Sequence, residues 1–165
     1  MNYNNLLKFK LQKKSKIPLN KGWTNPANLS TDIDMKYGYN VGVATGRVNN
    51  LIVLDIDIKD EGELEFNKYI SQYGDIDTIK ILTPSGGYHY YFKYAIDNKD
   101  DQYLIDNCLL TKCKYRGKGI DIRSNGGYVV APPSTINNIE YKLVSNTTDI
   151  INMPAIMIHF LLESD

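Results

Sequence analysis

Two aspartates at the end of an apolar run could hold a metal ion. Residues 51–57 read LIVLDID, and a run of aliphatic and β-branched residues is typical of a buried strand. Because strand side chains alternate between faces, Asp55 and Asp57 share one face and lie about 6–7 Å apart. Two buried carboxylates need a cation or several hydrogen-bond donors, since an unpaired buried charge costs several kcal/mol. A divalent metal ion would meet that need.

A third carboxylate is expected on a second strand. Residues 119–123 read GIDIR, which places Asp121 and Arg123 on one face. Three carboxylates from two strands could hold two metal ions about 3.5–4 Å apart, as in phosphoryl transfer. Oxygen ligands favour Mg²⁺ or Mn²⁺. The alternative for Asp55 and Asp57 is a solvated strand end that leads into an acidic turn.

A glycine-containing loop and the residues near it could bind phosphate. The loop consists of Ser85, Gly86 and Gly87. Glycine lets its backbone amides turn toward phosphate oxygens, and His89 would then lie over a triphosphate. Arg123 could bind a phosphate through two hydrogen bonds, and Lys118 could add a point charge. The alternatives are an ordinary strand histidine for His89 and surface charge for the two cations.

The length and composition of the chain predict a single domain over residues 1–165. No signal peptide and no 18-residue apolar stretch occurs, which predicts a soluble protein of the cytoplasm or of a viral replication compartment, without a membrane partner. Cys108 and Cys113, with two histidines in the chain, leave a zinc site short of ligands, so we expect free thiols.

Charge is balanced overall but unevenly distributed. The chain has 19 basic and 19 acidic residues, which argues against strong unaided binding to nucleic acid. Six lysines precede the first acidic residue, Asp32, and a second basic segment covers 112–123. Between them, residues 55–77 are mostly acidic. Two basic segments around an acidic one suit a polyanion held at a metal, although solvated surface faces would give the same pattern.

The elements around these residues are predicted to form an α+β fold. Helices are expected over 4–14, over 63–73 with Leu64 facing inward, and after Pro154. Strands are expected over 39–44, 51–57, 78–82, 88–94, 119–123, 128–131 and 139–144. The first two strands should be neighbours, and 78–94 should form a hairpin. Residues 97–114 show little periodicity beyond one helical turn. This order favours a mixed or antiparallel sheet with helices on one side.

In this order, the segments resemble the primase-polymerase (prim-pol) domain of the archaeo-eukaryotic primase superfamily, found in plasmid, phage and viral replication proteins. The resemblance rests on IP at 17–18 with GW at 22–23, VGVATG at 41–46 running into 51–57, PSGGYH at 84–89, and GIDIR at 119–123 with GGYVVAPPS at 126–134. It implies an RNA-recognition-motif-like sheet packed with helices, plus a small N-terminal α/β unit. Gly87 stands where many superfamily members carry the serine of a Ser-x-His motif.

By this resemblance, Asp55, Asp57 and Asp121 would hold two catalytic Mg²⁺ or Mn²⁺ ions, and His89 would contact the phosphates of the incoming nucleotide. The implied substrates are nucleoside triphosphates, and the implied partners are a primer, a single-stranded DNA template and a helicase domain or subunit. The family's domain is commonly followed by further segments, so we expect this chain to be the N-terminal part of a longer replication protein.

The leading hypothesis is a template-directed nucleotidyltransferase, a DNA primase or polymerase that makes or extends primers. A metal-dependent nuclease or phosphohydrolase could use the same carboxylates, although the loop at 85–87 suits a triphosphate better. A nucleotide- or nucleic-acid-binding module without turnover is the non-enzymatic alternative.

Overall fold

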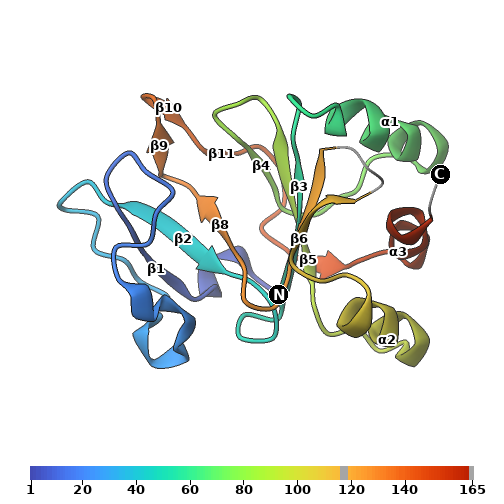
Figure 1. Cartoon of the computed structure of the whole chain (residues 1–165), viewed down its shortest axis with the longest axis horizontal. Coiled ribbons are helices and arrows are strands. Elements are labelled where there is room, and N and C mark those ends of the chain that lie inside the picture. The colour runs from blue at the N-terminus through green and yellow to red at the C-terminus, as the bar shows by residue number, and fades with distance from the viewer. Residues whose placement is uncertain (116–118, 164–165) are drawn as a thin grey trace.

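The computed structural model describes residues 1–115 and 119–163 (Figure 1). In these ranges, two sheets lie side by side, and a short hairpin extends from the smaller one. The smaller sheet contains β1 (Lys8–Leu11), β2 (Asn40–Ala44) and β8 (Tyr128–Ala131), in the order β1-β2-β8. The hairpin pairs β9 (Thr135–Ile136) with β10 (Ile139–Glu140).

The larger sheet is built around β3 (Leu51–Ile56), which carries the first predicted carboxylate. It also contains β4 (Lys80–Leu82), β5 (Tyr88–Lys93), β6 (Lys112–Tyr115), β7 (Ile120–Arg123), β11 (Lys142–Leu143) and β12 (Ile151–Asn152). The strand order is β11-β4-β5-β3-β7-β6, with antiparallel neighbours, and β12 adds to β5 in parallel. Both edges of β3 are therefore occupied, by β5 and by β7.

The helices cover one face of the larger sheet, as the sequence predicted (Figure 1). They are α1 (Gly62–Tyr73), α2 (Lys99–Asn107) and α3 (Ala155–Leu162). Ile52, Leu54 and Ile56 of β3 point into a core that all three helices share, through residues such as Phe66, Ile105 and Met157. The predicted α+β fold class is confirmed in the part of the chain that the structure describes.

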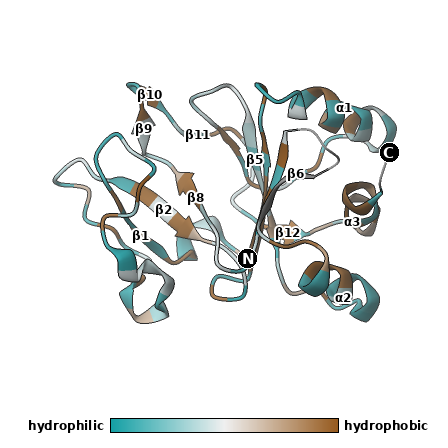
Figure 2. Cartoon of the chain, in the orientation of Figure 1, coloured by the Kyte–Doolittle hydropathy of each residue, from teal (hydrophilic) through white to brown (hydrophobic). Residues whose placement is uncertain are grey.

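The opposite face of the larger sheet points toward the smaller sheet. Leu51 and Val53 of β3 and Tyr91 of β5 join a second core with Phe9 and Val43. Figure 2 shows hydrophobic residues along β2 and β8 of the smaller sheet, where they face this core. Residues at the end of β3 that share the face of Val53 therefore lie where the two sheets meet.

The predicted helix over 4–14 is wrong. A 3₁₀ turn (Tyr3–Asn5) is followed by β1, which pairs with β2. The leucines at 6, 7 and 11 suggested helical spacing, but Phe9 and Leu11 alternate with Lys8 and Lys10 and are buried as in a strand. Further 3₁₀ turns, Lys21–Thr24 and Pro26–Asn28, complete this N-terminal region.

Other expectations need smaller corrections. The strands at 39–44 and 51–57 are not neighbours in one sheet, because β2 and β3 belong to different sheets and share only the bridge between Gly46 and Leu51. Leu64 is exposed rather than inward, and residues 97–114 hold α2 and part of β6. The strand expected over 139–144 is divided between β10 and β11.

No helix within residues 1–115 and 119–163 is long and apolar enough to cross a membrane.

Candidate active site

The pairing of β3 places three of the predicted site residues next to one another. Asp55 lies directly opposite His89 on β5 and directly opposite Asp121 on β7. Side chains directly opposite in an antiparallel pair have Cβ atoms about 5 Å apart and point to the same face. Asp55 therefore stands between a histidine and a second carboxylate, on the face that points toward the smaller sheet.

Arg123 links the two carboxylates. Its Nη2 atom lies 2.8 Å from Oδ2 of Asp121 and 3.9 Å from Oδ2 of Asp55. Nε2 of His89 lies 3.4 Å from Oδ1 of Asp55. Like charges directly opposite in a sheet repel each other, and the guanidinium offsets this repulsion. The structure thus places a cation beside Asp55 and Asp121, whereas the sequence predicted one beside Asp55 and Asp57.

Asp57 is positioned differently from the other two aspartates. It follows β3 directly, and its Oδ1 accepts a hydrogen bond of 2.9 Å from the backbone amide of Lys59. Its own backbone amide donates to the carbonyl of Gly119, just before β7. Asp57 is therefore fixed at the same end of β3 as Asp55, but its carboxylate is engaged with the following turn.

The loop at 85–87 lies at the end of the β4–β5 hairpin, beside the end of β3. The amide of Gly86 donates to the carbonyl of Thr83, so this amide stabilises the turn. Oγ of Ser85 lies 3.0 Å from Oγ1 of Thr83. Lys118, the remaining predicted phosphate ligand, lies outside the described residues.

A cavity of about 340 Å³ opens beside Asp55, between the two sheets. From the larger sheet it is lined by Asp55, His89 and Arg123, and from the smaller sheet by β8 and the turn before it. Drug-sized and cofactor-sized ligands occupy pockets of about 300–1,000 Å³. Asp57, Asp121 and residues 85–87 lie outside this lining, so the cavity gathers only part of the predicted set.

The cavity also contains residues that the sequence did not single out, including Lys16, Thr111 and Tyr141. The ring of Tyr141 lies 5.8 Å from that of His89, centroid to centroid. Lys16 belongs to the basic N-terminal segment, and that charge pattern could have suggested it. No local signal marks Tyr141, because only the fold brings residue 141 to β5.

Several neighbours act on the charge of Asp55. Burial raises the pKa of its carboxyl, but the nearby His89 ring, Arg123 and Lys16 together outweigh burial and bring the pKa below its ordinary value. Burial and the charge of Asp55 raise the pKa of Tyr141 to about 12. At neutral pH, the cavity thus presents an ionised carboxylate and a protonated phenol that can donate a hydrogen bond.

We expect Asp55 in the metal-free protein to titrate below its ordinary value of 3.8. Because the folded pKa lies below the unfolded one, the ionised group stabilises the fold above the unfolded pKa. That contribution is lost as the pH falls through the folded pKa. Carboxyl-carbon NMR between pH 2 and 6 measures the midpoint, and Lys16→Met should move it upward. A wild-type midpoint at or above 3.8 would contradict this assignment.

The donor set fits a hard divalent cation. Asp55 and Asp121 are partly buried, with side-chain exposures of 28% and 20%, and they supply only oxygen atoms. In the described residues, no three His, Cys, Asp or Glu side chains are arranged so that they could hold a metal ion as they stand. A third carboxylate would come from Asp57 if its side chain left the Lys59 amide. Arg123 and the metal would compete for the same carboxylates.

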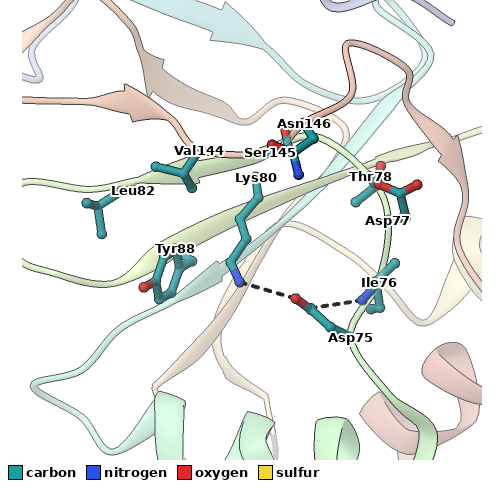
Figure 3. A pocket seen from close by; sticks show the side chains of 10 residues that line it. All are labelled: Asp75, Ile76, Asp77, Thr78, Lys80, Leu82, Tyr88, Val144, Ser145 and Asn146. Atoms are coloured by element: carbon teal, nitrogen blue, oxygen red, sulfur yellow. Dashed lines mark hydrogen bonds and ion pairs between the residues drawn. The ribbon is translucent and has the colours of Figure 1, made fainter.

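A larger cavity, of about 450 Å³, lies along β4, which pairs with the edge of β5 away from β3 (Figure 3). Lys80 is among the residues that line it, and its Nζ lies 3.7 Å from Oδ2 of Asp75 and over the rings of Tyr88 (4.5 Å) and Tyr90 (4.9 Å). None of the predicted site residues lines it. Its lysine is already occupied by an acid and two rings, so the smaller cavity beside Asp55 is the better candidate.

Comparison with known proteins places the chain in a family. Residues 6–156 match the model of the family Prim-Pol, described as bifunctional DNA primase/polymerase, N-terminal. The match covers nearly the whole chain and every predicted site residue. A search of curated proteins gave no match.

Proposed function

This chain belongs to the family of bifunctional DNA primase/polymerase N-terminal domains, and we propose that it is a metal-dependent, template-directed nucleotidyltransferase that makes or extends primers. The observation that supports this proposal is the position of Asp55. It lies between Asp121 and His89 on neighbouring strands, beside a cavity between the two sheets. A metal-binding pair and a phosphate-contacting residue would stand side by side in that arrangement.

In this proposal, Asp55, Asp121 and Asp57 hold Mg²⁺ or Mn²⁺. When bound, such ions lower the pKa of the primer's 3′ hydroxyl and neutralise charge on the leaving pyrophosphate. The role of the chain itself is to fix the carboxylates. β3 and β7 set the spacing of Asp55 and Asp121 through backbone pairing, so the geometry does not depend on a loop.

The nucleotide would enter the cavity with its phosphates toward His89. Nε2 of His89 faces the carboxylate of Asp55, so a phosphate bound at the metal would be within reach of the ring. Arg123 would turn from the carboxylates to a phosphate once a metal ion neutralises Asp55 and Asp121. We propose the loop of Ser85, Gly86 and Gly87, and Lys118, as further phosphate contacts from the family resemblance.

Nucleoside triphosphates, a primer and a single-stranded DNA template are the proposed substrates and partners. A helicase domain or subunit as a further partner is a proposal that rests on the resemblance alone.

Primer extension tests the proposed activity. A labelled primer annealed to a longer single-stranded template is incubated with the chain, with dNTPs or NTPs, and with Mg²⁺ or Mn²⁺. We expect products longer than the primer that require template, nucleotide and metal. Shortened DNA in the absence of nucleotides would instead indicate a nuclease. Nucleotide binding without any product, with either metal, would indicate a binding module.

A further inference from the structure

A lysine-rich surface continues from the candidate active site onto the smaller sheet. The first 31 residues contain six lysines and no acidic residue. Among the described residues, none of Lys10, Lys13, Lys14 and Lys16 is in an ion pair with a carboxylate. We call these four residues, together with Lys36, Tyr37 and Tyr39, the basic edge. Lys16 acts on the charge of Asp55 across the cavity, and the ammonium groups of Lys10, Lys13 and Lys14 remain open to an anionic ligand.

The loop that carries three of these lysines is held in place by the sheet. It turns between the amide of Gln12 and the carbonyl of Ile17, which are hydrogen bonded at 2.8 Å. The hydroxyl of Tyr128 on β8 donates to the carbonyl of Lys16 at 2.8 Å. Nδ2 of Asn40 on β2 donates to the carbonyl of Ser15 at 3.0 Å. A ligand would therefore meet a loop that is already ordered, which lowers the entropy lost on binding.

The same loop reaches the active-site cavity. Lys16 lines the cavity together with Asp55 and Arg123. Lys13 and Lys14 are exposed on the loop just before it. A polyanion bound along this loop would thus lead into the cavity beside the carboxylates.

Aromatic rings alternate with the lysines of the basic edge. Nζ of Lys10 and Nζ of Lys13 lie 5.1 Å and 5.7 Å from the centre of the Tyr39 ring. Nζ of Lys36 lies 5.8 Å from the ring centre of Tyr37, which is 55% exposed. Proteins that bind single strands combine cations for phosphates with exposed rings on which bases stack. A duplex has no free base faces to offer such rings.

We propose that the basic edge binds single-stranded DNA and guides the template into the cavity at Lys16. This proposal rests on the proposed function for its direction, toward the active site. The binding itself does not depend on turnover. Lys13, Lys14 and Lys16 would contact phosphates, and Tyr37 would stack on a base.

The test is fluorescence anisotropy of a labelled 20-nucleotide oligo(dT) at several salt concentrations, without nucleotides. We compare the wild type with the triple variant Lys13→Ala, Lys14→Ala, Lys16→Ala. The control removes three exposed lysines elsewhere, with Lys59→Ala, Lys99→Ala and Lys142→Ala. Because each phosphate contact contributes about 0.7 to the slope of log K against log salt, the basic-edge variant should lose about 2 from this slope. Its affinity should fall at least tenfold, and the control should keep the wild-type slope.

Tyr37 gives a second, independent measurement. We expect Tyr37→Ala to weaken oligo(dT) binding about tenfold with an unchanged salt slope, because stacking is not a charge interaction. Tyr37→Phe keeps the ring and should bind like the wild type. Equal affinities and slopes for the basic-edge variant and its control, or no binding of oligo(dT) by the wild type, would overturn the proposal. Because this experiment measures binding and no reaction, its result can be interpreted even if primer extension fails.

Discussion

The Asp55→Asn variant should lose about 10³-fold in primer-extension rate while it keeps the wild-type fold. Removing one carboxylate charge weakens metal binding and transition-state stabilisation by several kcal/mol, and about 4 kcal/mol corresponds to this factor. Asparagine has nearly the same shape and still fits between β5 and β7. Rates of extension under saturating nucleotide, together with Mn²⁺ binding by electron paramagnetic resonance, measure the effect.

Asp121→Asn should lose activity to a similar extent, since both carboxylates would hold the same ions. Asp100→Asn is the matched control, because Asp100 is exposed in the first turn of α2, on the helix-covered side of the larger sheet. It should extend primers at the wild-type rate. Extension by Asp55→Asn within threefold of the wild type would exclude Asp55 as a metal ligand and would remove the main support for the proposed site.

The strands of the larger sheet could be predicted because local pattern and tertiary environment agree there. Ile52, Leu54 and Ile56 face the helices, and the residues between them face the smaller sheet, as strict alternation requires. His89 and Tyr91 likewise lie on the face opposite to Tyr90 and Phe92. This alternation fixes which face each candidate site residue occupies. The sequence does not give the strand order that brings His89, Asp55 and Asp121 into line.

The N-terminal strand could not be predicted because a distant partner decides its conformation. Phe9 pairs with Gly42, and a side chain added at Gly42 would lie 2.6 Å from the Phe9 ring. The ring thus fills space that the glycine leaves empty, and it stacks on Trp23 at 4.9 Å. Contacts 14 to 33 residues away therefore outweigh the local spacing of leucines that suggested a helix.

The turns after β2 and after β7 have a structural role that the spacing of the motifs in the sequence could not reveal. The chain passes between the two sheets after β2 and again after β7, and the two connections are hydrogen bonded to each other. Oγ1 of Thr45 donates to the carbonyl of Ser124 at 2.6 Å, and the amide of Arg47 donates to Oδ1 of Asn125 at 2.9 Å. These hydrogen bonds join the two connections between the sheets, next to Gly126 and Gly127, which line the cavity. A motif residue without evident chemistry can thus still position the site.

Gly87→Ser should lower both stability and activity, although it would restore the serine that many superfamily members carry before the histidine. A Cβ atom at Gly87 would lie 2.2 Å from the carbonyl oxygen of Ile56, between the two aspartates at the end of β3. The contact is with backbone, so β5 and β3 must separate. We expect a loss of about 1–3 kcal/mol in unfolding free energy. A shift of about 1 Å in the carboxylates should slow extension about 10²-fold.

Gly74→Ala separates the effect on the site from a general loss of stability. Gly74 ends α1 with a φ of +85°, and a Cβ atom there would meet nothing within 4 Å. Alanine should therefore cost about 1 kcal/mol from backbone strain alone and leave extension by the folded protein unchanged. Urea unfolding and extension rates, measured on both variants, give the comparison. If Gly87→Ser extended primers at the wild-type rate, the spacing of β3 and β5 at Ile56 would not limit the reaction, which would contradict this prediction.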